Sequence, residues 1–203
     1  MALVKGGVAL IKLSFRSIMI IALSVLLFDC AGNSYKKMAI EKPENLLLIQ
    51  DSLILAHGDD KIVLAALAVA NNSVAKKYMN KGDYKLAADH FSRSLKLIET
   101  NTESKYGLLL ADGRALVKKG NKNGIWDAIE KYSKASDLFP SSGEPYYLTA
   151  LAYTKLGDTD FDLILESYEK SISLNLNYQL RDEVLKKYQH AKKRKTKLDS
   201  FWK

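Results

Sequence analysis

Apolar and small residues recur at intervals of three and four along most of the chain, which is the spacing of amphipathic helices. The clearest stretch runs from Trp126 to Asn175. It predicts one helix that ends at Phe139-Pro140 and a second that begins at Tyr146. A turn at Gly157-Asp158 then precedes a third helix, which ends near Leu174. The sequence contains no long alternation of apolar and polar residues between turn residues, so the pattern predicts an all-α fold.

The predicted helix pairs recur with a period of about 34 residues, and small and aromatic residues keep similar offsets in each copy. In the clearest copy these residues are Ala128, Tyr132, Ala135, Leu138 and Pro140, followed by Ala150, Tyr153 and Gly157. The pattern resembles the tetratricopeptide repeat, a helix-turn-helix unit that stacks into an array. The resemblance implies about three repeats over residues 68–176, the first over about 68–101, the second from near 106 and the third over about 143–176.

The turns between the two helices of each repeat carry the next part of the resemblance. Gly82-Asp83-Tyr84 matches the turn of the first repeat, and Ala87 and Phe91 follow at the family's spacing. A small residue at Ala87 lets two helices approach closely, while Phe91 fills the space one turn later. The turn of the second repeat, Asn121 to Gly124, is expected to be about three residues longer than usual.

Additional helices are expected on both sides of the repeats. Residues 44–67 should hold a leading helix, from Glu44 to Ala56, and the start of the first repeat helix, from Lys61 to Lys81. Residues 177–203 should form a capping helix and a basic tail, because a stacked array exposes apolar surface at its end. The apolar face of that capping helix comprises Leu180, Val184, Leu185 and Tyr188.

The net charge of +8 belongs to the two ends of the chain. Basic residues precede an apolar run near the start, others cluster between Lys186 and Lys203, and acids and bases nearly balance in between. Nucleic-acid binding needs a basic patch with stacking aromatics, and the tail offers only Trp202. We therefore do not expect nucleic acid as a partner. Contact of the tail with anionic lipid and a simple solvated helix stay open as alternatives.

The amino terminus indicates a membrane-directed protein. Ser17 to Phe28 is an uncharged run, and its twelve residues as a helix span about 18 Å, short of the roughly 30 Å hydrocarbon core of a bilayer. A secretory signal of this length fits better than a spanning helix. Cys30, the single cysteine, follows directly and resembles the lipidated cysteine of bacterial lipoproteins, with Leu27 at the position three before it.

That resemblance implies a signal peptide over residues 1–29, lipidation at Cys30 and a polar tether over residues 30–43. It also implies attachment facing the periplasm, with Ala31 permitting sorting to the outer membrane. Phe28 and Asp29 are larger than the residues usual before the cut, so an uncleaved inner-membrane signal anchor stays open. The basic residues before the apolar run favour a body outside the cytoplasm in either case.

The sequence offers no catalytic constellation. Its three histidines are scattered and form no metal-binding spacing. Ser73 and Lys76 satisfy a SxxK pattern, but the companion motifs of the acylating enzymes are absent and the pair falls within a predicted helix. We therefore expect neither an enzyme nor a cofactor or metal.

The inner helices of such an array face a concave groove, and their exposed positions are the candidate partner-binding residues. By repeat register these are Asn72, Lys76, Arg114, Lys118, Tyr147, Leu151 and Lys155. They would form a mildly basic channel that could hold an extended peptide with acidic groups or a terminal carboxylate. A solvated helix face is the alternative. The carboxylate-clamp subfamily, which binds chaperone tails, expects polar or basic residues where Ala111, Glu144 and Leu148 stand, so that function is not supported.

Taken together, these features predict a non-catalytic, membrane-tethered scaffold for protein–protein interactions in the bacterial cell envelope, acting in assembly, secretion or turnover of envelope components. The expected partners are a protein or peptide in the groove and a membrane at the amino terminus, and homo-oligomers are possible for such arrays. Two alternatives stay open: an accessory lipoprotein of periplasmic solute transport, and a signal-anchored adaptor.

Overall fold

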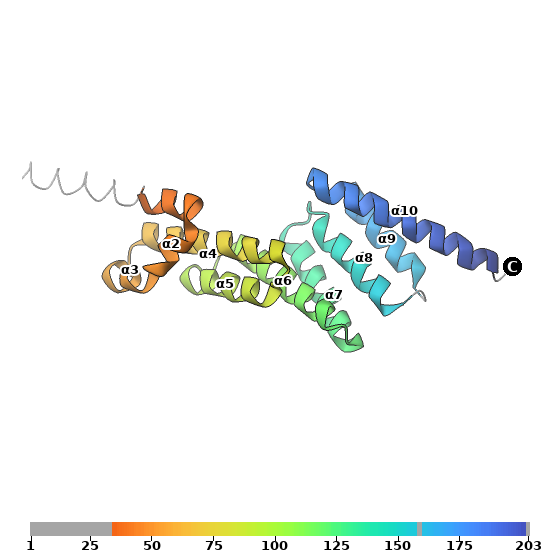
Figure 1. Ribbon diagram of the computed structural model, residues 1–203, viewed down its shortest axis with the longest axis horizontal. Helices are drawn as coiled ribbons and strands as arrows, with labels where there is room; N and C mark the ends of the chain where they lie inside the picture. Colours follow the sequence, from red (N-terminus) through yellow and green to blue (C-terminus); the bar gives the residue numbers. More distant parts are fainter. Residues whose placement is uncertain (1–33, 158–159, 202–203) are drawn as a thin grey trace, which may run out of the picture.

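The computed structural model describes residues 34–157 and 160–201, and these form an all-α array. Residues 34–41 are helical. The helices that follow are α2 (Pro43–Leu48), α3 (Gln50–His57), α4 (Lys61–Lys81), α5 (Tyr84–Leu97), α6 (Thr102–Lys119), α7 (Lys122–Leu138), α8 (Glu144–Leu156), α9 (Phe161–Ser173) and α10 (Tyr178–Phe201). Each helix from α4 onward packs against its neighbours in sequence (Figure 1). Within these described ranges a single β-bridge, between Ser142 and Asn175, is the only extended pairing.

The helices stack as three pairs, α4 with α5, α6 with α7, and α8 with α9. The first members of the pairs, α4, α6 and α8, also contact one another in order and form the inner layer. The second members, α5, α7 and α9, form the outer layer. This is a tetratricopeptide-like arrangement, and the predicted all-α fold of three stacked helix pairs is confirmed. α2 and α3 lie at one end of the array and α10 covers α9 towards the other (Figure 1).

Short polar side chains set where several helices begin. Asp60 accepts a hydrogen bond from the Ile62 N–H at 2.7 Å and caps α4, as the sequence indicates. Asn121 caps α7 by accepting from the Gly124 N–H at 2.6 Å. The prediction of a longer second turn is therefore wrong, because this cap places residues 122–124 in the first turn of α7. Gly120 precedes the cap with φ of 77°, a left-handed conformation that ends α6 at little cost for glycine.

Two glycines of α6 allow the neighbouring outer helices to approach it closely. The Phe91 ring of α5 lies where a Cβ on Gly107 would be, at 2.4 Å from the ideal Cβ position. The Tyr132 ring of α7 lies at the same distance from the ideal Cβ of Gly113. Both rings are almost fully buried, and Ala87 lies in the same core as Phe91. Ala87 and Phe91 pack in one core as predicted, whereas the contacts of the two rings with Gly107 and Gly113 are additional.

The amino-terminal end differs from the sequence prediction in two ways. Residues 34–41 are helical and Ala39 is fully buried, so this part of the expected tether packs on the folded domain. The single helix expected over residues 44–56 is interrupted at Ile49, whose N–H bonds the Leu46 carbonyl in a tighter turn. The interruption lets α2 and α3 each place one leucine, Leu46 and Leu53, in the core beneath them.

The carboxy-terminal helix α10 covers the exposed side of α9, as predicted. Val184 is fully buried and Arg181 donates hydrogen bonds to the carbonyls of Ile172 and Leu174, which satisfies the end of α9. Leu185, expected on the same apolar face, is 40% exposed. The buried residues of α10 are Val184 and Ala191, which lie two helical turns apart on one side of the helix. In the part of the chain that the structure describes, no helix is both long enough and apolar enough to cross a bilayer.

A buried polar cluster joins the amino-terminal helices to the first pair. The Asn71 amide donates to the Leu67 carbonyl at 3.0 Å and to Gln50 Oε1 at 3.1 Å, so its oxygen is the acceptor that faces His90 Nδ1 at 3.0 Å. His90 therefore donates from Nδ1, and its ring stacks on Tyr78. Burial, with a smaller effect from Arg93, lowers the pKa of His90 below its ordinary value of 6.5.

The lowered pKa of His90 predicts a pH dependence of stability. The pKa of His90 is lower in the folded protein than in the unfolded chain, so the unfolded chain takes up the proton first as the pH falls. The contribution of His90 to the free energy of unfolding is therefore complete above the ordinary pKa and is lost as the pH drops through the folded pKa. We expect the free energy of unfolding, measured by urea titration, to fall from pH about 7.5 to about 5, and to fall less in His90→Asn. An equal fall in His90→Asn would contradict this role, and His190→Asn on α10 is the control for loss of a histidine.

The packing against α6 predicts that Gly107→Ala destabilises the array. A methyl group there overlaps the buried Phe91 ring, which costs about 1–3 kcal/mol, while the gain in helix propensity offsets up to about 1 kcal/mol. Urea unfolding should show the net loss, and combining the change with Phe91→Leu should recover part of it. Simple additivity in this double-mutant cycle would mean that the two side chains do not compete for the same space.

Candidate functional site

A hollow on the inner layer brings together four of the residues predicted for the groove. Arg114 and Lys118 of α6 are four positions apart, as are Leu151 and Lys155 of α8, so each pair lies on one face of its helix. The cavity that they line measures about 340 Å³. The rest of its lining is Gly82, Tyr84, Val117, Tyr132 and Leu148. We call this cavity the basic hollow.

The basic hollow carries three cations and no carboxylate among its lining residues. Lys118 donates to the Gly82 carbonyl at 3.1 Å, and its ammonium lies 5.8 Å from the centre of the Tyr84 ring. The Arg114 guanidinium lies at the same distance from that ring. Lys155 is exposed at the rim. Aromatic faces stabilise cations at such distances, so Tyr84 holds two positive charges beside each other.

Arg114 is the least exposed of these cations, and it joins α6 to α8. Its Nη2 lies 3.0 Å from Oε1 of Glu144. Although burial disfavours the charged guanidinium, Glu144 and Tyr84 raise the pKa of Arg114. Its Nε is buried and has no hydrogen-bond partner among the residues that the structure describes. Because Nε is buried, a ligand in the hollow could contact only the exposed part of this guanidinium, whose side chain is 26% exposed.

Two tyrosines of the outer helices, Tyr84 of α5 and Tyr132 of α7, reach the lining of the basic hollow. Burial raises the pKa of Tyr132, which lines the basic hollow, so this hydroxyl keeps its proton at physiological pH. Sequence reasoning assigned Tyr132 to packing alone and did not name Tyr84 as a site residue. The position of Tyr84, directly after the turn at Gly82, was the available signal, because that turn faces the next inner helix.

A second cavity of about 690 Å³ lies beside the basic hollow. It includes Lys76 and the carboxylates of Glu103 and Glu144, so its charge is mixed. Lys76 pairs with Glu103 at 2.5 Å, and both side chains are more than half exposed. Because Arg114 lines one cavity and Glu144 the other, their ion pair separates the two. Lys76 therefore belongs to a neighbouring part of the inner layer.

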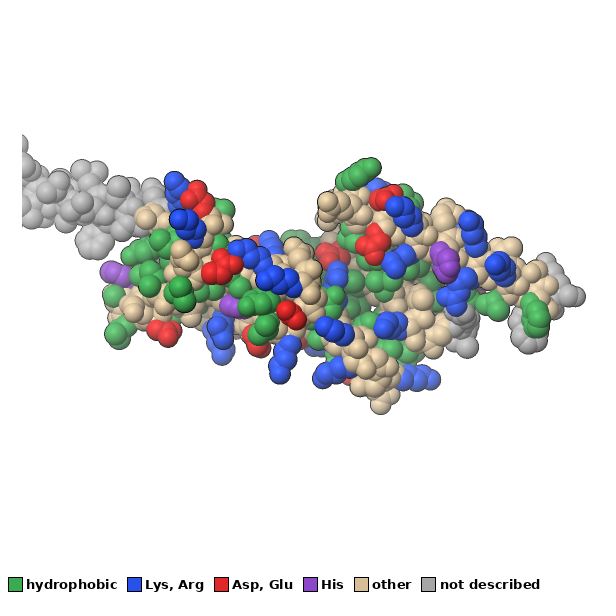
Figure 2. Space-filling view, viewed as in Figure 1, with side chains coloured by type: hydrophobic (Ala, Val, Ile, Leu, Met, Phe, Trp, Pro, Cys, Tyr) green, Lys and Arg blue, Asp and Glu red, His purple; other side chains and the backbone are tan. Residues whose placement is uncertain are grey.

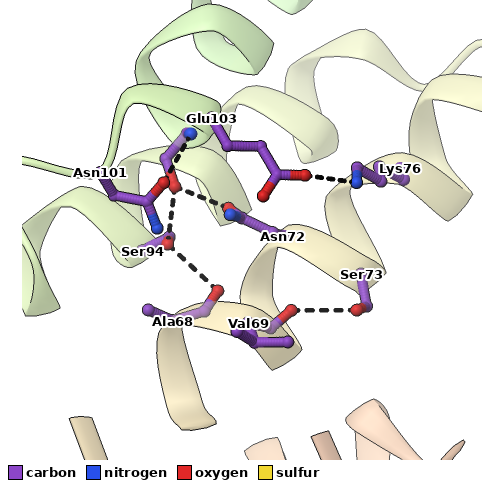
Figure 3. Close-up of polar contacts among 9 residues, drawn as sticks. Ala68, Val69, Asn72, Ser73, Lys76, Ser94, Asn101 and Glu103 are labelled. Carbon is purple, nitrogen blue, oxygen red and sulfur yellow. Dashed lines mark hydrogen bonds and ion pairs between the residues drawn. The ribbon is translucent and has the colours of Figure 1, made fainter. Parts of the chain in front are cut away.

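Asn72 lies inside the protein rather than in the groove. It is 4% exposed, and its side-chain oxygen faces the Ser104 hydroxyl at 2.8 Å (Figure 3). Ser104 in turn contacts the Ser94 hydroxyl at 2.8 Å, and Ser94 donates to the Ala68 carbonyl at 3.1 Å. The three contacts Asn72–Ser104, Ser104–Ser94 and Ser94–Ala68 each need a proton, and the two serine hydroxyls supply only two. With the Asn72 amide turned so that Nδ2 faces Ser104, the amide supplies the third proton.

Tyr147 is likewise internal, because α10 covers it. Only 3% of the residue is exposed, and its hydroxyl donates to Glu183 of α10. Burial is the largest of the effects that raise the pKa of Tyr147, and the Glu183 carboxylate adds to it. Its place in the structure is the joint between α8 and the capping helix.

A further cavity lies on the outer layer, between α7 and α9 with α8 beneath. It measures about 820 Å³ and its lining includes Asp137, Glu166 and Glu169 as acids and Lys170 as a cation. Glu169 accepts a hydrogen bond from Tyr188, and Lys170 lies 5.9 Å from the centre of the Tyr146 ring. The sequence prediction did not include this cavity, because its polar residues occur at ordinary solvated positions of outer helices.

Within the described ranges, no group of three or more histidine, cysteine or acidic residues is arranged to hold a metal ion. No protein-family model matches the chain, and a search of curated proteins finds no match. Among solved structures, the chain is similar to the tetratricopeptide domain of P58(IPK), with a TM-score of 0.48 and 18% sequence identity. The similarity covers 81% of this chain and 47% of that chain, so this chain spans about half the length of the protein it resembles.

The positions of Asn72 and Lys76 predict opposite sensitivities to substitution. Asn72→Asp places a charged carboxylate in a buried network, which should cost about 2–4 kcal/mol of unfolding free energy. Lys76→Ala removes an exposed ion pair and should cost less than about 1 kcal/mol. Urea unfolding of the two variants measures the difference. Similar small losses would show that Asn72 is not part of a closed network.

Proposed function

We propose that the protein is a non-catalytic scaffold that binds an acidic segment of a protein partner in the basic hollow. The observation that carries this proposal is the gathering of Arg114, Lys118 and Lys155 around one cavity that no carboxylate lines. Charges of one sign around a concave surface focus the field and favour ligands of the opposite sign. Leu148 and Leu151 add an apolar floor for the partner's side chains.

The two inner cavities suit an extended segment that runs along α6. The mixed cavity and the basic hollow follow one another on this helix, since the first includes Glu103 and Gly107 and the second Arg114 and Lys118. A segment with its acidic end at Arg114 would meet the exposed part of that guanidinium and the ammonium groups of Lys118 and Lys155. Charge-assisted hydrogen bonds to a carboxylate are shorter and stronger than neutral ones. The carboxylate is therefore the group that this hollow is best suited to bind.

We also propose that the scaffold is tethered to a membrane in the bacterial cell envelope, where it serves assembly, secretion or turnover of envelope components. Support comes from the sequence, because the apolar run from Ser17 to Phe28 is followed at once by Cys30. Both lie outside the described residues. A tether confines a weak binder to a surface and so raises its effective concentration near membrane partners.

Binding in the basic hollow predicts discrimination between acidic and neutral peptides. Two fluorescent peptides that differ only in carrying glutamate or glutamine are titrated with the protein, and their affinities are measured by fluorescence anisotropy. The glutamate peptide should bind more tightly, and its affinity should depend more strongly on salt. Lys118→Glu combined with Lys155→Glu should weaken the glutamate peptide by about tenfold or more, because two favourable charges become unfavourable. The control is Lys96→Glu, an exposed lysine on outer helix α5.

The outcome that contradicts this assignment is equal binding of the glutamate and glutamine peptides, or equal weakening by Lys96→Glu. Arg114 is left unchanged in the test because it also pairs with Glu144. Its removal would leave that half-buried carboxylate unpaired and confuse binding with stability.

Tethering at Cys30 predicts a specific mass and location. Protein purified from membranes should begin at Cys30 and carry added acyl mass, and Cys30→Ala should lack this mass and keep residues 1–29. Intact mass spectrometry and membrane fractionation measure both. An unmodified full-length chain in the membrane would favour the signal anchor, and a soluble chain cut elsewhere would exclude tethering.

A further inference from the structure

The amino-terminal end of the array exposes aliphatic side chains that no part of the described chain covers. Leu55 is 91% exposed, Leu48 84% and Ile40 73%. Ile49, at the junction of α2 and α3, and Ile54 of α3 are exposed to a smaller degree. We call these five residues the amino-terminal apolar surface. Hydrophobic side chains are visible over α2 and α3 in Figure 2.

These side chains are not needed for the fold of the helices that carry them. α2 and α3 already bury Leu46 and Leu53 against α4, so their core positions are filled. Leucines on the opposite side gain nothing from the folded array and expose apolar area to water. The ends of stacked arrays usually present polar faces, and contiguous apolar patches at a surface mark sites of contact. We therefore expect this end to be covered by an apolar surface or a membrane.

The membrane is the nearest apolar phase in either interpretation of the amino terminus. Lipidation at Cys30 and an uncleaved anchor ending at Phe28 both place the bilayer within a few residues of Ser34. Residues 34–41 are helical and Ala39 is buried, so no slack remains beyond Ser34. Ser34 lies four residues after Cys30 and six after Phe28, and extended chain of these lengths reaches at most about 14 Å and about 22 Å. The folded domain is thus held against the headgroup region by its amino-terminal end.

Local charge neither opposes nor replaces this apolar contact. Among residues 34–57 the lysines Lys36, Lys37 and Lys42 are balanced by Glu41, Glu44 and Asp51. A neutral surrounding adds no attraction to anionic lipid, so apolar burial is the interaction that remains. Binding at this end should then occur on zwitterionic lipid.

We propose that the amino-terminal apolar surface lies in the bilayer interface, so that the array is docked end-on rather than swinging on its tether. The proposal rests on the membrane attachment put forward above. Docking by α2 and α3 would fix the direction of the array, with α6 and α8 further from the bilayer than α4 (Figure 1). The basic hollow would then be presented at a set height above the membrane.

The test uses the full chain, purified from membranes and reconstituted into phosphatidylcholine vesicles that contain a lipid with a headgroup nitroxide. A fluorophore is attached to Leu55→Cys or, as the matched control, to Tyr178→Cys on α10, where the native residue is 86% exposed. A lipidated Cys30 has no free thiol, so the label enters only at the introduced cysteine; if wild-type protein in the vesicles takes label, the probes are placed in a Cys30→Ala background. We expect the probe at residue 55 to lose most of its emission and the probe at residue 178 to keep it. Leu48→Glu should restore the emission at residue 55 without changing urea unfolding, because Leu48 points into solvent.

Each other outcome is decisive. Vesicle-bound protein with no quenching at residue 55, or with equal quenching at both positions, overturns end-on docking and leaves the tether intact. A probe at residue 55 that is shielded from aqueous iodide yet unquenched by the lipid overturns docking in favour of a protein contact. Protein that does not float with the vesicles, and whose wild-type form takes label at Cys30, overturns the tether and the docking together.

Discussion

The close approach of α6 to both neighbouring outer helices is the contact on which the rest of the array depends. Gly107 accepts the Phe91 ring from one side and Gly113 accepts the Tyr132 ring from the other. A helix pair of this kind cannot bury its apolar faces alone, so stability comes from stacking of neighbours. With any side chain at these two positions the two rings would have to shift from their places against α6.

The same packing determines where the charged residues stand. Arg114 follows Gly113 directly, and the Tyr132 ring that packs on Gly113 also lines the basic hollow. The hollow is therefore a consequence of how α6 meets α7 and α8, and the Arg114–Glu144 pair links α6 to α8 across it. Binding energy in such a site comes from donors that are already in place before the partner arrives. The Arg114 guanidinium, which Glu144 holds in place, is such a donor, and the exposed lysines chiefly supply charge.

Much of the fold could be predicted from the sequence, because its packing residues recur at a fixed period. The helices α4 and α5 and the capping role of α10 were predictable from Gly82, Phe91 and Val184 alone. The interruption at Ile49 was not, since a run of leucines and isoleucines fits one helix or two. The length of the second turn was missed because Asn121 is equally suited to a loop and to a helix cap.

The site was only partly predictable, for a physical reason. Repeat register identifies the face of a helix, and it placed Arg114, Lys118, Leu151 and Lys155 on one surface. Repeat register does not identify which side chains of neighbouring helices contact and cover that face. Ser104 lies 32 residues from Asn72 and Glu183 lies 36 from Tyr147, and these partners turn both residues into internal ones. The tether prediction failed over residues 34–41 for the same reason, because a polar segment can still bury one alanine.

The central claim is that the inner layer, and not the outer one, receives the partner. Photo-crosslinking of the full chain in its native membranes tests it most directly, with a photoreactive residue at Leu151 in the basic hollow or at Lys96 on outer helix α5. A discrete protein adduct is expected from position 151, and it should disappear when Lys118 and Lys155 are both changed to glutamate. Adducts from position 96 alone, or an adduct at position 151 that survives this charge reversal, would contradict it.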